Sequence, residues 1–143
     1  FLIAETHQLA LFAGACNECS NCEVYCPEHG APFRVKERLF SSEAAFDASE
    51  DDGFWSSAGE LRARLGGRVL TLGVDEAANG AYLTAGDMRL ELSWHPLQSL
   101  GGSVEPNARP LDTARLWRMR TAWDAIYRSV RSNPVNPAVS RGA

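Results

Sequence analysis

The four cysteines of the chain lie within eleven residues, and their spacing constrains the protein more than any other feature of the sequence. They are Cys16, Cys19, Cys22 and Cys26, separated by two, two and three residues, and a proline follows the last one directly. This is the spacing of a bacterial-type ferredoxin loop, in which three thiolates of one tight loop reach three different irons of a 4Fe–4S cubane. We therefore interpret all four cysteines as metal ligands and as the cofactor-binding residues of a 4Fe–4S site.

Two other uses of four cysteines are less consistent with this pattern. Disulfides between neighbours only three or four positions apart are geometrically awkward. Zinc sites usually pair two short Cys-x-x-Cys units across a longer gap, often with histidine. A structural zinc or iron–sulfur module, which serves only for interaction and has no redox role, is the alternative to a redox cluster.

The number of ligands leaves open whether one or two clusters are served. In two-cluster ferredoxins, the fourth cysteine of such a run ligates the other cluster. By this rule Cys16, Cys19 and Cys22 hold one cluster and lack a fourth ligand, whereas Cys26 serves a second cluster. The chain contains no further cysteine and begins at Phe1 without a methionine, so we expect a fragment of a longer protein whose first cluster loop lies upstream.

Composition predicts a cytoplasmic protein. Hydrophobic residues make up 45% of the chain, and no apolar run approaches the ~20 residues of a membrane span. Residues 1–12 are too polar for a signal peptide. Because all cysteines lie in one loop and none is left for stapling the fold, we expect a reducing compartment and no membrane partner.

Charge is distributed unevenly along the chain. Residues 1–108 contain seven Lys/Arg and sixteen Asp/Glu, a net charge of −9, whereas residues 109–143 contain seven and two, a net charge of +5. The acidic part could steer the docking of a basic partner, and the two parts could equally attract each other within the fold. The charges therefore identify no partner.

Short elements are predicted around the cysteines. Residues 7–12 read as a strand, residues 33–40 as an irregular extended segment, and residues 43–48 as a helix that a serine at 41 or 42 caps. The acidic run 49–53 predicts a solvated turn rather than a cation site, because no calcium-loop spacing follows it. His29 is interpreted as a turn residue, since the cysteines already supply the expected ligands.

The second half of the chain predicts strands and one long helix. The expected elements are a helix at 58–65 introduced by a Ser57-to-Glu60 capping box, strands at 68–74, 81–85 and 88–94, a linker at 101–110, and a helix at 113–132. The turn signal Asn79-Gly80 and the alternating apolar residues of 88–94 predict an antiparallel meander, and Asp112 or Thr113 caps the long helix. His95 follows the last strand and is interpreted as a strand-end residue rather than a catalyst. The apolar stripe of the long helix consists of Leu116, Met119, Trp123, Ile126 and Val130. No nucleic-acid reader motif accompanies its arginines, so we expect no nucleic-acid partner.

These elements predict an α+β fold, in which half of a bacterial-type ferredoxin cluster module is followed by a small antiparallel β-meander covered by the C-terminal helix. The expected domains are a cluster region at residues 1–54, a small α+β lobe at 55–132 and a disordered tail at 133–143.

The residues around the cysteines also carry a family resemblance. The stretch from Cys16 to Phe33, together with Leu39-Phe40, Ser42-Glu43 and Phe46, resembles the C-terminal, ferredoxin-like end of the putative selenate reductase subunit family. Its members are large flavin and iron–sulfur oxidoreductases related to the glutamate synthase small subunit and to dihydropyrimidine dehydrogenase. The resemblance covers roughly residues 7–54. The chain departs from it at Ser20, where the family usually has glycine, and at residues 33–36, where it usually has Tyr-Lys-Asp-Lys.

The resemblance implies a role in electron transfer. It implies that the cysteine loop relays single electrons from a flavin held elsewhere in the full-length protein, where FAD and NAD(P)H would bind. The expected partners are the upstream flavin and ferredoxin part of the same polypeptide, or another redox subunit. We expect no catalytic residue in this fragment, and its substrate and final acceptor remain undefined.

Overall fold

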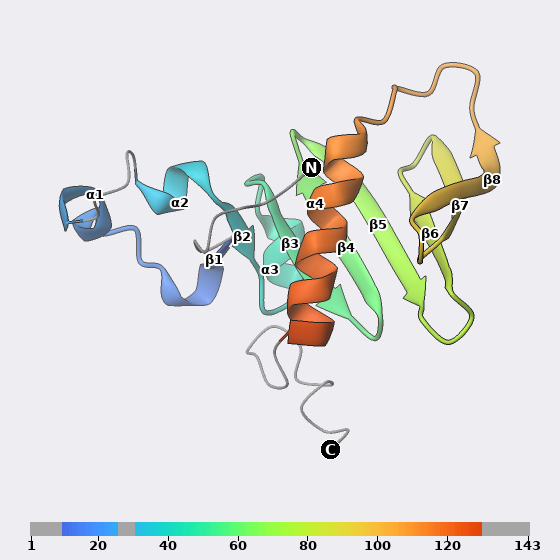
Figure 1. Cartoon of the computed structure of the whole chain (residues 1–143). Helices are drawn as coiled ribbons and strands as arrows, with labels where there is room; N and C mark the ends of the chain where they lie inside the picture. Colours follow the sequence, from blue (N-terminus) through green and yellow to red (C-terminus); the bar gives the residue numbers. More distant parts are fainter. Residues whose placement is uncertain (1–9, 26–30, 130–143) are drawn as a thin grey trace.

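The chain folds around one mixed sheet whose strands follow each other in sequence order (Figure 1). The structure is a computed structural model, and it describes residues 10–25 and 31–129. Within these ranges the strands are β1 (Ala10–Phe12), β2 (Glu37–Leu39), β3 (Gly53–Ser57), β4 (Glu60–Leu65), β5 (Arg68–Asp75), β6 (Gly80–Thr84), β7 (Met88–Ser93) and β8 (Gln98–Val104). Strands β1, β2 and β3 pair in parallel, and every later pair is antiparallel.

Short helices join the parallel strands, and a longer one follows the sheet. They are the 3₁₀ turn η1 (Ala13–Ala15), α1 (Asn21–Tyr25), α2 (Pro32–Val35), α3 (Glu43–Ala48), α4 (Thr113–Asp124) and the π-helical turn η2 (Ala125–Ser129). Parallel neighbours need a crossover connection; η1, α1 and α2 lie in the first connection and α3 lies in the second. No helix in the described ranges is both long and apolar enough to cross a membrane.

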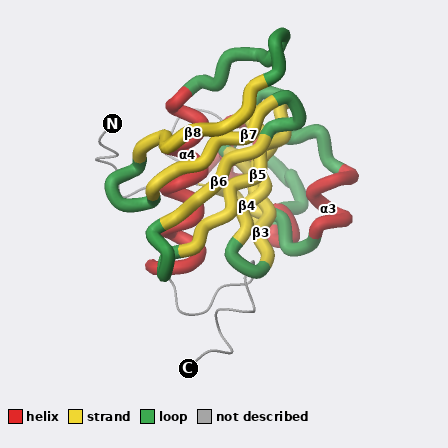
Figure 2. The backbone as a smooth tube through the Cα atoms, turned by 90° about the vertical axis from the view of Figure 1, so that its right-hand side faces the viewer, coloured by secondary structure: helices red, strands yellow, loops and turns green. Residues whose placement is uncertain are grey.

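The sheet has one helix on each face. In β4 the buried residues Leu61, Ala63 and Leu65 alternate with residues that point the other way, the period expected of a strand. The first set packs in the core beside α4. On the opposite face Arg62 pairs with Glu43 and Asp47 of α3. Figure 2 accordingly shows α4 and α3 on opposite sides of the strands.

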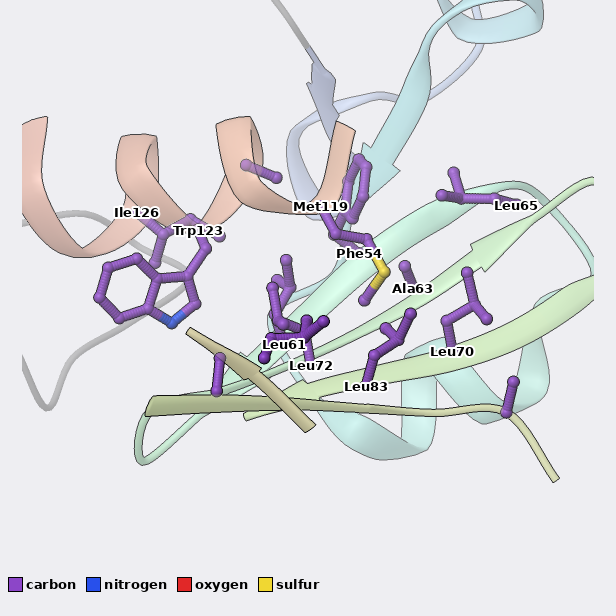
Figure 3. Packing of buried hydrophobic residues seen from close by; sticks show 14 of the residues in the cluster. Phe54, Leu61, Ala63, Leu65, Leu70, Leu72, Leu83, Met119, Trp123 and Ile126 are labelled. Atoms are coloured by element: carbon purple, nitrogen blue, oxygen red, sulfur yellow. The ribbon is translucent and has the colours of Figure 1, made fainter. Parts of the chain in front are cut away.

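The core lies between α4 and the meander, as Figure 3 shows. Met119 and Trp123 of α4 and Ile126 of η2 face the sheet, and each is at most 5% exposed. On the sheet side, Leu72 and Leu83 are fully buried. Burying a large apolar side chain stabilises a fold by roughly 1.5–3 kcal/mol relative to leaving it exposed. This packing fixes the position of α4.

The expected half-ferredoxin module followed by a separate small meander is wrong. The cysteine region and the meander share one sheet, because β1 pairs with β2 and β2 pairs with β3. All strands thus belong to one mixed sheet with one long helix, rather than to a ferredoxin-like α+β cluster module.

Three local predictions are also wrong. Residues 58–65 form no helix, because Ala58 and Gly59 make a tight turn with positive φ (48° and 85°) and the alternating apolar residues of β4 fit a strand. Residues 33–40 begin as helix α2, and the expected extended conformation is found only at β2, Glu37–Leu39. Residues 101–104 of the expected linker at 101–110 form the second half of β8. Gly101 and Gly102 made this stretch resemble a linker, because glycine is rare in strand interiors.

Other local predictions are confirmed. The Ser42 hydroxyl caps α3 by accepting a hydrogen bond from the Ala45 amide (3.2 Å), and Asp112 caps α4 by accepting from the Ala114 amide (2.9 Å). The three meander strands lie within one residue of their predicted bounds at each end. Residues 7–9 of the first predicted strand, Val130 and the tail at 133–143 fall outside the described residues.

Candidate functional site

The cysteine loop lies at the β1 end of the sheet. It connects β1 through η1 to α1, and Figure 1 shows α1 beyond β1 and β2, away from α4. Cys16 follows η1, Cys19 lies in the irregular segment, and Cys22 lies in α1. Cys26 and His29 fall outside the described residues, so the structure places three of the four predicted ligands.

The loop has an unusual backbone for a stretch without glycine. Glu18 and Ser20 both have positive φ (55° and 63°), a region that side chains other than glycine enter rarely. The Asn17 side chain accepts a hydrogen bond from the Cys19 amide (3.3 Å), and the Ser20 carbonyl accepts one from the Glu23 amide (3.0 Å). Glycine, the usual residue of the resembled family at position 20, would adopt this φ without steric cost. Serine at position 20 therefore carries a local steric cost that glycine would avoid.

The three described thiols are available for ligation. Cys16 and Cys22 are half-buried, Cys19 is exposed, and none of them forms a disulfide. In the described ranges, no three His, Cys, Asp or Glu side chains converge closely enough to hold a single metal ion. Next to the thiols, Val24 and Tyr25 of α1 are 74% and 83% exposed. The loop thus combines free thiols with an exposed apolar surface.

An arginine of the sheet holds the cysteine loop. The Arg38 guanidinium contacts the Glu18 carboxylate (Nη2–Oε1, 2.7 Å) and the Asp51 carboxylate (Nε–Oδ2, 3.1 Å). Its side chain is only 14% exposed, and Asp51 in turn accepts a hydrogen bond from the Ser49 hydroxyl (3.1 Å). The acidic run predicted as a solvated turn therefore also anchors an arginine. Sequence reasoning missed Arg38; the only signal was the acidic run, whose clustered carboxylates attract a nearby cation.

The backbone of Arg38 is fixed by a close approach of two strands. The Arg38 amide donates a hydrogen bond to the Asp52 carbonyl (2.9 Å). A Cβ added at Gly53 would lie only 2.5 Å from the Arg38 carbonyl oxygen, too close for any side chain. Glycine at position 53 therefore permits the β2–β3 pairing at this point. The Asp52 carboxylate accepts from the Gly66 amide (2.8 and 2.9 Å) and ties the same loop to the end of β4.

His95 lies two residues after the end of β7, toward the edge of the sheet opposite the cysteine loop. Its ring nitrogens lie 3.1 Å from Nη2 of Arg120 and 2.8 Å from Nη2 of Arg128. Arg120 also donates to the carbonyl of Trp94 (3.1 Å). These contacts connect the end of β7 to α4 and η2, which agrees with the interpretation of His95 as a strand-end residue.

The sheet face opposite α4 carries a groove of about 800 Å³. Trp55, Arg62 and Tyr82 contribute to its lining. The Tyr82 hydroxyl donates a hydrogen bond to the Glu60 carboxylate, and this bond, together with burial, raises the pKa of Tyr82 above its ordinary value of 10.0. Sequence reasoning missed this pair because it assigned Glu60 to a helix cap.

Comparison with known proteins finds a partial similarity to an oxidoreductase. No family model matches the chain, and no solved structure matches it. The protein named "Putative oxidoreductase YgfK" matches in Escherichia coli K12 and in Escherichia coli O157:H7, each with 38% identity over 60 residues. The aligned segment is 42% of this chain and 6% of each relative, so the chain spans only a small part of their length. The finding supports a likeness to oxidoreductases and does not specify a selenate reductase subunit.

Proposed function

We propose that the chain binds a 4Fe–4S cluster through its cysteine loop and transfers electrons as part of a larger flavin-dependent oxidoreductase. The observation that carries this proposal is the run Cys16, Cys19, Cys22 and Cys26, whose spacing is that of iron–sulfur loops. The partial similarity to a protein named as an oxidoreductase supports a redox role.

Two features of the loop are consistent with cluster binding. The described thiols are free, as thiolate ligands must be. In a cubane each cysteine binds a different iron, so ligation does not require three sulfurs to converge on one ion. The bound cluster would supply one-electron chemistry, while the chain would hold it by its thiolates and tune it through hydrogen bonds and burial.

The surroundings of the loop suit contact with a further redox partner. Cys19 is exposed, and Val24 and Tyr25 present apolar surface beside it. Contiguous exposed apolar surface marks interaction sites on proteins, and these two neighbouring side chains could form part of such a surface. We propose that the upstream flavin-binding part of the same polypeptide, with FAD and NAD(P)H, or another redox subunit covers this surface.

Anaerobic reconstitution with iron and sulfide tests the cluster. We expect iron and sulfide uptake with an electron paramagnetic resonance signal after reduction, but in substoichiometric amounts if Cys26 serves a second cluster. A Cys19→Ser variant is the matched control and should hold less iron. Equal iron in both proteins would refute the proposal. Uptake of zinc with no iron–sulfur signal would instead establish the structural metal-binding alternative.

The assignment of Cys26 requires the longer protein. Cys22→Ser and Cys26→Ser should each remove a thiolate from a different cubane, so a different cluster should survive in each variant. Flavin reduction by a nicotinamide donor should continue in both, while transfer to the final acceptor fails. The same surviving signal in both variants would show that the two cysteines ligate one cluster, and normal onward transfer would disprove the relay.

A further inference from the structure

The ion pair between Arg38 and Glu18 joins the loop to the sheet at a defined point. Glu18 lies between Cys16 and Cys19 and is one of the two loop residues with positive φ. Its carboxylate lies 2.7 Å from Nη2 of Arg38, and Arg38 belongs to β2, whose neighbours are β1 and β3. The described residues 13–25 that follow β1 form no strand pairing. A side-chain contact at position 18 therefore limits the movement of the flanking thiols relative to the sheet.

The surroundings of Arg38 make this contact firmer than an ordinary surface ion pair. Exposed pairs contribute little, because two long side chains must be ordered in water. Arg38 is 14% exposed, and Asp51 also holds its guanidinium through Nε. Its Nη2 contacts Glu18 and also donates to the Phe33 carbonyl at 3.5 Å. A guanidinium presents several donors in a fixed planar arrangement, so one group can contact two carboxylates. The ordering cost of Arg38 is thus shared among three contacts, with Asp51, Glu18 and the Phe33 carbonyl.

We propose that Arg38 is a positioning residue for the cysteine loop, acting through Glu18 to hold Cys16 and Cys19 in place for ligation. This inference rests on the proposed cluster-binding function, although the anchoring itself does not depend on iron. Groups outside the ligand shell that orient the ligands typically change metal affinity by 10–100-fold when removed. Lysine cannot replace Arg38, because a single ammonium on a flexible stem lacks the fixed donors needed for both carboxylates.

The iron-free chain provides the first test. Hydrogen exchange of the amides at residues 16–20 should become about tenfold faster in Arg38→Gln, in Glu18→Gln and in the double variant, with no further increase in the double variant. Arg62→Gln is the matched control, because Arg62 also joins two carboxylates, Glu43 and Asp47, but lies on the α3 side of the sheet. It should leave loop exchange unchanged. Unchanged exchange in Arg38→Gln, with the amides of β4–β7 equally protected, would overturn the proposal.

The reconstituted chain provides the second test. Release of iron to a chelator should be about tenfold faster in Arg38→Gln than in the unmodified chain, and Arg38→Lys should restore little of the difference. The two tests separate the two hypotheses. If the unmodified chain takes up no iron, the proposed function fails, and hydrogen exchange still decides the role of Arg38. If iron release is the same in all variants, the cluster is held but Arg38 does not position its ligands.

Discussion

Replacing Trp123 with alanine tests the packing of α4 on the sheet. Trp123 is 3% exposed and lies between two other aromatic rings. Its ring centroid is 5.3 Å from that of Trp94 in an edge-to-face arrangement and 4.9 Å from that of Tyr127 in a stacked one. Its indole N–H also donates to the Gly59 carbonyl (3.4 Å). The substitution therefore leaves a cavity where helix, meander and the β3–β4 turn meet.

The expected cost is large compared with the stability of a small protein. Truncating a buried tryptophan to alanine costs about 3–5 kcal/mol, and aromatic pairs contribute about 0.5–1.5 kcal/mol each within that total. The Gly59 carbonyl still accepts a hydrogen bond from the Val74 amide (3.3 Å), so its lost partner adds little. Domains of this size are stable by about 5–15 kcal/mol, and Trp123→Ala should therefore remove a substantial part of the stability.

Urea unfolding followed by far-ultraviolet circular dichroism measures the effect without depending on tryptophan fluorescence. With an m value of about 2 kcal/mol/M, a loss of about 4 kcal/mol lowers the midpoint by roughly 2 M. Trp117→Ala is the control on the same helix, because Trp117 is 44% exposed, and it should cost less than about 1 kcal/mol. A cost below about 1 kcal/mol for Trp123→Ala would place its side chain at the surface and refute this packing.

Three further substitutions test other contacts. Gly73→Ala should cost about 1–3 kcal/mol, because its Cβ would overlap the Tyr82 ring, and the cost should disappear in a Tyr82→Ala background; an equal cost in both would contradict this explanation. In thermal unfolding, Ser42→Ala should lower the stability by about 1 kcal/mol and Ser42→Gly by only a few tenths. Equal losses of stability in the two variants would show that the Ser42 cap is unimportant. The hydrogen bond from the Arg109 amide lowers the pKa of Asp87 in the folded protein below its ordinary value of 3.8. The ionised carboxylate therefore stabilises the fold above pH 3.8, and this stabilisation should be lost as the pH falls through the lower pKa of the folded state. Asp87→Asn should flatten this acid limb, and an unchanged pH profile would disprove the assignment.

Sequence patterns with a local cause predicted the structure well. Ser42 and Asp112 begin helices because a side-chain oxygen satisfies an amide close to it in the chain. The turn at Asn79 and the alternating residues of 88–94 predicted the meander for the same reason, since period and turn chemistry act over a few residues. The cysteine spacing likewise defines the candidate ligands without reference to the fold.

Long-range pairing was decided only by the tertiary structure. The pattern from Ser57 to Glu60 satisfies a helix-capping rule, yet the chain forms a hairpin there because β3 and β5 pair with β4 on either side and Leu61 enters the core. Residues 98–104 contain two glycines and become a strand because β7 offers them an edge. The contact of Arg38 with Glu18 joins positions twenty residues apart in sequence, and nothing local to either residue specifies it. The sequence by itself predicted the candidate ligands and several local elements, because spacing, capping and turn chemistry act over a few residues. The sheet order and the residue that contacts the cysteine loop depend on which distant strands meet.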